Sequence, residues 1–77
     1  MIAFIETLDY DDKEIFWQVM TEALEQMTKM QRQCLLMSII GFEQTAIGKI
    51  LGVNNKSVSY HFNNALDKIM EISKEVV

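Results

Sequence analysis

The sequence predicts an all-α domain of four helices, in which the last two helices form a helix-turn-helix. Three observations support this fold class. The 77-residue chain contains no proline and only three glycines, so helix-breaking residues are rare. From Val58 to Val76, apolar residues recur at steps of three and four, which is the period of one amphipathic helix. Gly52 precedes this helix, where a turn after an earlier helix favours a left-handed residue.

The N-terminal part of the chain predicts an arm followed by a first helix. Residues 1–10 contain apolar side chains without a clear period, and we expect an arm that packs on its own domain or on a partner. A helix is predicted over about residues 11–27, because its acidic start suits the positive end of the helix dipole and its apolar residues form one stripe. That stripe consists of Phe16, Val19, Met20, Ala23, Leu24 and Met27.

A second helix is predicted from Thr28 to Ile40. Thr28 and Gln31 match the spacing of a capping box, and Gly41 follows the last apolar residue. Apolar side chains lie nearly all round this helix, so we expect it at the centre of the core. Cys34 lies within it, and a lone cysteine cannot form an internal disulfide. We therefore expect a buried thiol in a reducing, cytoplasmic setting.

A third helix is predicted over about 44–51 and a fourth over about 55–74. Ile47, Ile50 and Leu51 are expected on one apolar face of the third helix. Gly48 costs this helix roughly 1 kcal/mol relative to alanine, which predicts close approach by the following helix.

The turn between these two helices has a residue suited to each of its positions. Gly52 supplies the left-handed conformation, Val53 a closing hydrophobic contact, and Asn54 the N-cap of the next helix. We therefore assign residues 42–75 to the helix-turn-helix and residues 11–40 to two supporting helices. All 77 residues are expected to form one domain.

The net charge of −4 is unevenly distributed. Residues 1–40 carry seven acidic and three basic side chains, whereas residues 41–77 carry four of each. Residues 44–64 contain two lysines and one histidine but no acid, so this stretch tolerates an anionic partner without attracting it strongly. The apolar runs are too short for a membrane span, and we expect neither a membrane partner nor a leader peptide.

In helix-turn-helix motifs, the second helix packs on the domain through its apolar rear face, and its first turns present side chains to the major groove of DNA. The predicted fourth helix has this pattern. Nucleic-acid recognition is therefore the leading hypothesis. The sequence shows no glycine-rich phosphate loop, nucleophile signature or metal-ligand cluster. We expect no enzyme activity, cofactor, metal or small-molecule substrate.

Three segments resemble the fourth conserved region of bacterial sigma factors, the domain that binds the upstream promoter element. The segments are ALEQMTKMQRQCLLM (23–37), AIGKILGV (46–53) and SVSYHFNNAL (57–66). The turn at 39–44, together with His61 and Asn64, is more similar to the related LuxR/GerE-type effector domains. The resemblance implies a winged-helix-like domain of the sigma region-four type, without a sheet, that binds duplex DNA.

The resemblance also implies which residues contact DNA. The base-contact set would be Asn55, Lys56, Ser59 and Tyr60. Asparagine can bind adenine bidentately, lysine can reach guanine O6 and N7, and tyrosine can bond a phosphate or pack on a thymine methyl group. Other residues would orient the domain on the DNA backbone. This backbone-contact set would be Gln44, Thr45, Lys49, Ser57, His61, Asn63 and Asn64.

A second candidate surface is apolar and lies in the N-terminal part of the chain. It consists of Ile2, Phe4, Ile5, Leu8 and Trp17. The sigma resemblance implies that this region binds the β flap of RNA polymerase, and a homodimer is the alternative. Three hypotheses follow: a sigma-like reader of promoter DNA, a dimeric LuxR/GerE-like regulator, and a protein-interaction module. The last would bind polymerase, a sigma factor or an anti-sigma partner.

Overall fold

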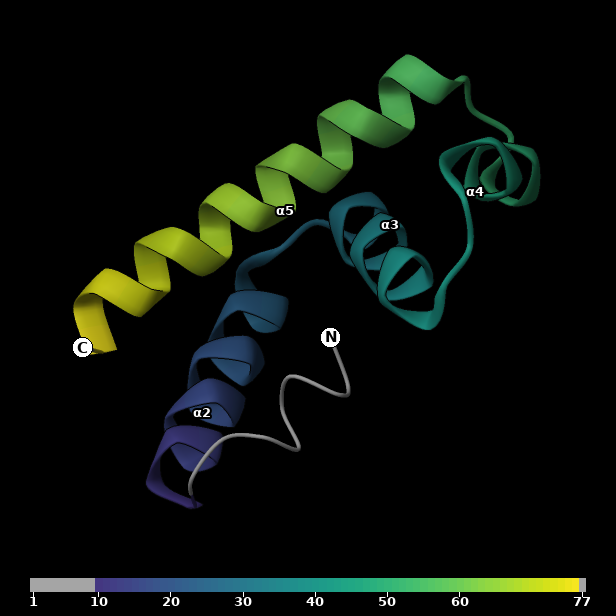
Figure 1. Ribbon diagram of the computed structural model, residues 1–77. Helices are drawn as coiled ribbons and strands as arrows, with labels where there is room; N and C mark the ends of the chain where they lie inside the picture. Colours follow the sequence, from purple (N-terminus) through teal and green to yellow (C-terminus); the bar gives the residue numbers. More distant parts are fainter. Residues whose placement is uncertain (1–9, 77) are drawn as a thin grey trace.

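The computed structural model describes residues 10–76, which form four helices (Figure 1). The helices are α2 (Tyr10–Gln26), α3 (Lys29–Ile40), α4 (Gln44–Leu51) and α5 (Asn55–Val76). This part of the chain contains no strand, which confirms the predicted all-α fold class. The long helix α5 contacts each of the other three helices, with α2 along its C-terminal half and α4 near its start (Figure 1). Residues 1–9 of the predicted arm lie outside the described residues, and Tyr10, predicted to belong to the arm, instead begins α2.

The start of α3 has the capping box that the sequence predicts. The Thr28 hydroxyl accepts a hydrogen bond from the Gln31 backbone N–H at 3.1 Å, and the Gln31 side chain accepts one from the Thr28 N–H at 3.0 Å. Gly41 ends the helix, and its N–H donates to the carbonyl oxygens of Met37 and Ser38. Local sequence signals therefore fix both ends of α3.

One hydrophobic cluster joins α2 and α3 to the C-terminal half of α5. The predicted stripe of α2 is confirmed, and Ala23 in its middle is completely buried. Ala65 of α5 is also completely buried, which lets the helices pack closely. The buried members are Val19, Met20, Ala23, Met27, Leu35, Ala65 and Ile72.

A second cluster holds the helix-turn-helix together. Its buried members are Cys34 of α3, Ile47 of α4 and Val58 of α5, so one residue comes from each helix. Val53 of the turn packs against this cluster, as predicted. Phe62 packs against both clusters and connects them. The first turns of α5 are thus fixed from behind by apolar contacts.

The prediction that Ile50 shares the buried face of α4 is wrong. Ile50 is 55% exposed, whereas Ile47 is 1% exposed. The buried face of α4 is centred between Ile47 and Gly48. At roughly 100° per residue, Leu51 falls within this face and Ile50 falls about 110° from its centre. The eight-residue helix packs on α3 and α5 through its buried face, and Ile50 lies outside that face.

The burial predicted for α3 also needs correction. Cys34 and Leu35 are fully buried, but Leu36 and Ile40 are exposed. The helix packs on α5 and α4, whereas Leu36 is 40% exposed and Ile40 is 72% exposed. Helix α3 therefore lies against the core and is not enclosed by it.

None of the described helices combines the length and the hydropathy that a membrane span needs.

Candidate nucleic-acid interface

The turn before α5 is built from local hydrogen bonds. Gly52 has a φ of 74°, the left-handed conformation that ends α4. The Val53 N–H donates to the Gly48 carbonyl oxygen at 2.9 Å. The Asn54 side-chain oxygen accepts a hydrogen bond from the Ser57 N–H at 2.8 Å, which confirms the predicted N-cap. The start of α5 therefore has a defined direction relative to α4.

Gly48 allows the turn to approach α4. A Cβ atom on Gly48 would lie 2.6 Å from the Val53 carbonyl oxygen and 3.6 Å from Cγ2 of Val58. The first distance is too short for any real side chain. The following helix approaches Gly48 as predicted, through Val58 and Asn55 Oδ1 at 3.6 Å, but the closest group is the backbone of the turn.

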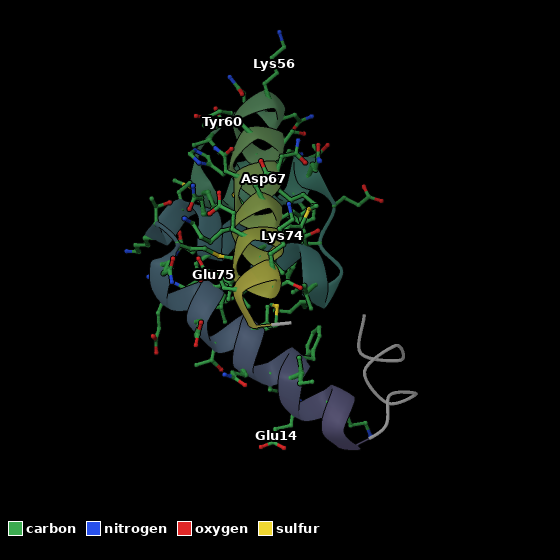
Figure 2. All side chains as sticks on the ribbon, turned by 90° about the vertical axis from the view of Figure 1, so that its left-hand side faces the viewer. Glu14, Lys56, Tyr60, Asp67, Lys74 and Glu75 are labelled. Atoms are coloured by element: carbon green, nitrogen blue, oxygen red, sulfur yellow. The ribbon has the colours of Figure 1, made fainter. Side chains whose placement is uncertain are left out.

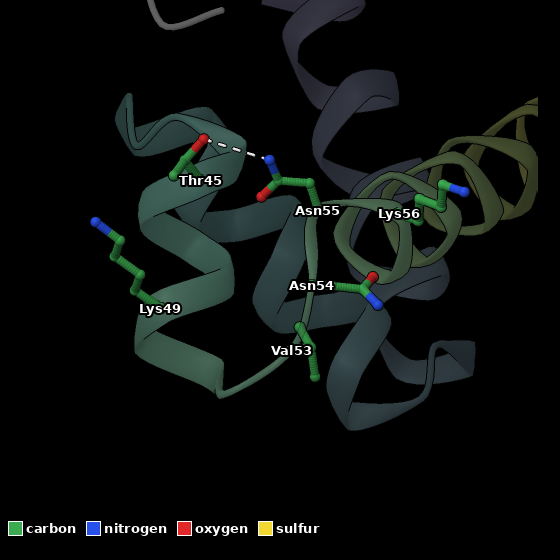
Figure 3. Close-up of a pocket in the computed structure, with 6 residues that line it drawn as sticks. All are labelled: Thr45, Lys49, Val53, Asn54, Asn55 and Lys56. Atoms are coloured by element: carbon green, nitrogen blue, oxygen red, sulfur yellow. Dashed lines mark hydrogen bonds between the residues drawn. The ribbon is translucent and has the colours of Figure 1, made fainter.

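Two hydrogen bonds connect the start of α4 to the start of α5. The Ser59 hydroxyl donates to Oε1 of Gln44 at 2.9 Å. The Asn55 side-chain amide donates to the Thr45 hydroxyl at 3.5 Å (Figure 3). Each bond joins one member of the backbone-contact set to one member of the base-contact set. The helix ends therefore present these four polar side chains as one surface.

An open concavity lies between α4 and the start of α5 (Figure 3). It has a volume of about 630 Å³ and is lined by Thr45, Lys49, Val53, Asn54, Asn55 and Lys56. The side chains of Lys49 and Lys56 point away from one another, one from each helix (Figure 3). No acidic residue lines the concavity. With two lysines and no acidic residue, the concavity is electrostatically suited to a polyanion.

The outer face of α5 carries the other candidate contacts. Lys56 and Tyr60 project from the N-terminal part of this face, and Asp67 and Lys74 project further along it (Figure 2). Tyr60 is 64% exposed, and the His61 ring packs edge-on against it with centroids 5.4 Å apart.

The remaining predicted DNA contacts differ in exposure. Asn63 is exposed, whereas Ser57 and Asn64 are half-buried. Further along α5, Lys68 forms an ion pair with Glu71 at 3.3 Å, so its charge is partly neutralised within the helix. The cationic part of the candidate surface is therefore confined to α4 and the first turns of α5.

Trp17 is the one residue of the predicted partner surface that the structure describes. It is 56% exposed on α2 and packs edge-on against Phe16. An open groove beside it is lined by Glu14, Trp17, Gln18, Thr21, Glu22 and Glu25. Helix α2 packs along the C-terminal half of α5, at the opposite end from Lys56 (Figure 1, Figure 2). The acidic surface and the candidate DNA surface are thus separate.

The first turns of α5 are polar, free of acidic residues and exposed on their outer side, and a glycine turn connects them to α4. This arrangement is that of a helix-turn-helix DNA-binding domain. The family model GerE, described as bacterial regulatory proteins of the luxR family, matches residues 25–76. The chain therefore belongs to this family of DNA-binding transcription regulators. No curated protein and no solved structure matches the chain.

The family match places the LuxR/GerE resemblance ahead of the sigma resemblance. It covers α3, α4 and α5 and includes only the last residues of α2. DNA-binding regulation of transcription is thereby confirmed at the level of the family. The matched segment also contains both hydrogen bonds between α4 and α5, which the sequence prediction missed. No local pattern indicates that Gln44 and Ser59, 15 residues apart, are paired.

Proposed function

We propose that this domain binds duplex DNA in a sequence-specific manner through the first turns of α5 and so regulates transcription. The observation that supports the proposal most is the acid-free, exposed start of α5, fixed on α4 by the second cluster. The base-contact set would enter the major groove. The backbone-contact set, on α4 and on the flanks of α5, would hold the domain on the phosphates.

The symmetry of the DNA site distinguishes two forms of this function. Membership of the LuxR family supports a dimeric regulator, which would bind an inverted repeat. A sigma-like domain acting beside RNA polymerase would bind a single asymmetric site. Selection from a random duplex library at low salt, with the purified 77-residue chain, separates the two. Failure to enrich any sequence would contradict sequence-specific binding.

A second candidate function is binding to a protein of the transcription apparatus through α2. It is supported by the exposure of Trp17 beside the acidic residues of that helix. This function predicts that Trp17→Ala weakens binding to RNA polymerase or a sigma factor, whereas Lys56→Glu leaves that binding unchanged. Immobilised chain and purified polymerase provide the assay. The opposite pattern would contradict a partner surface on α2.

A further inference from the structure

The direction of the Gln44–Ser59 hydrogen bond determines what Ser59 can offer to DNA. The Ser59 hydroxyl is the donor and Oε1 of Gln44 is the acceptor, at 2.9 Å. A hydroxyl has one proton and two lone pairs. With its proton directed at Gln44, Ser59 presents only lone pairs to any other partner.

Apolar packing behind the two residues holds them in this arrangement. Val58, directly before Ser59, is 1% exposed, and Ile47, one turn after Gln44, is equally buried. Both belong to the second cluster. Ser59 is half-buried and Gln44 is exposed, so the hydrogen bond lies at the surface that would face DNA. The packing of α4 on α5 therefore places the two backbones within reach of this bond.

We infer that Gln44 acts as a positioning residue that makes Ser59 select a base with an exocyclic amine, adenine or cytosine. This inference rests on the proposed DNA-binding function. In the major groove, adenine N6 and cytosine N4 carry donor hydrogens, whereas guanine O6 and N7 and thymine O4 are acceptors. Lone pairs on Ser59 attract the first group and repel the second.

The same bond leaves the donors of Gln44 free. Its carbonyl oxygen is used by Ser59, so both hydrogens of its amide nitrogen remain for a phosphate oxygen. Gln44 would thus bind the DNA backbone and, at the same time, orient the hydroxyl proton of Ser59. A single neutral hydrogen bond of this kind corresponds to roughly a three- to tenfold preference at one base position.

The test is parallel selection from random duplex libraries with four proteins: wild type, Ser59→Ala, Gln44→Ala and Gln18→Ala. The wild type should enrich a site with one position restricted to adenine or cytosine. Ser59→Ala should lose the restriction at that position only. Gln44→Ala should admit guanine or thymine there, because the released hydroxyl can donate. Gln18, an exposed glutamine on α2, is the matched control and should leave the site unchanged.

Several results would overturn the inference while leaving the proposed function standing. One is a Ser59-dependent position that prefers guanine or thymine. Another is a Gln44→Ala protein that binds every sequence more weakly with an unaltered preference. If Gln44→Ala does not fold, Gln44→Glu keeps the acceptor and should retain the restriction at lower overall affinity. If the wild type enriches no sequence, the proposed function and this inference both fail.

Discussion

The backbone of Val53 lies directly over Gly48. Its N–H donates to the Gly48 carbonyl oxygen at 2.9 Å, and its own carbonyl oxygen occupies the space 2.6 Å from where a Gly48 Cβ would stand. A side chain at position 48 would therefore push the turn, and with it the start of α5, away from α4. This contact therefore helps to fix the geometry of the candidate DNA surface, together with the second cluster.

Gly48→Ala should destabilise the domain and weaken DNA binding together. Overpacking against backbone costs about 1–3 kcal/mol, and the higher helix propensity of alanine offsets roughly 1 kcal/mol of this. Because the opposing atom is backbone, the cost lies in the upper part of that range. The net loss is then about 1–2 kcal/mol, and for a domain of this size we expect Tm to fall by roughly 5–15 °C. Thermal unfolding followed by circular dichroism measures the change. An unchanged or higher Tm would show that the turn moves at no cost.

Ile47 and Ile50 form a matched pair within α4. Ile47→Ala should lower the free energy of unfolding by about 2–5 kcal/mol, because it opens a cavity in the second cluster. Ile50→Ala should change it by less than about 0.5 kcal/mol, because Ile50 is largely exposed. Urea denaturation of the two variants provides the comparison. Equal losses would mean that α4 is rotated differently about its axis.

Cys34 should make stability depend on pH in the alkaline range. Burial raises the pKa of the Cys34 thiol, because desolvation disfavours the thiolate. In the unfolded chain the thiol titrates near about pH 8.5. The folded state holds the proton more tightly, so this stabilisation is complete below that pH and is lost as pH rises through the folded pKa.

The measurement is urea denaturation of wild type and Cys34→Ala between pH 7 and pH 10. The free energy of unfolding of the wild type should fall more steeply above about pH 8.5, by at most about 1.4 kcal/mol per pH unit. The variant lacks the titrating group, so the difference between the two curves isolates its effect. Parallel curves would contradict a thiol kept neutral by burial.

Lys56→Glu should abolish sequence preference and lower affinity for DNA at least about tenfold, without changing the fold. The loss of a base contact costs roughly 1–3 kcal/mol, and the new carboxylate repels phosphates. Lys74→Glu is the control, since it makes the same charge change on the same face at the far end of α5 (Figure 2). Fluorescence anisotropy with a labelled duplex should separate the variants. Equal effects would point to net charge alone.

The salt dependence of binding should be shallow. Lys49 and Lys56 are the exposed cations of the candidate surface, and His61 and Lys68 are further candidates for phosphate contacts, although Lys68 is paired with Glu71. A monomer would neutralise about two to four phosphates and give a slope of roughly −2 to −4 in log K against log salt, and a dimer about twice that. Anisotropy titrations across a salt series measure the slope. A slope near zero would exclude backbone contacts.

Local patterns in the sequence predicted the elements and their ends well. The Thr28 capping box, the left-handed Gly52 and the Asn54 cap involve residues within four positions of one another, and all three are present. The stripe on α2 and the inner face of α5 follow from the helical period. Such signals depend only on residues that are close together in the sequence, so they can be identified from the sequence alone.

Features that depend on the rotation of one helix against another could not be predicted. The exposure of Ile50 depends on which side of α4 meets α3 and α5, and three apolar residues on a short helix fit more than one rotation. The Gln44–Ser59 bond requires both the turn geometry and that rotation. The DNA contacts themselves, for which the base-contact set is a prediction, require the bound duplex.

The most direct test of DNA binding through the start of α5 is amide chemical-shift mapping of the isotope-labelled chain with its selected duplex. We predict the largest shifts over residues 44–49 and 55–61 and an unchanged indole N–H signal for Trp17. Shifts concentrated around Trp17 on α2, with the start of α5 unaffected, would contradict the assignment of the DNA-binding surface.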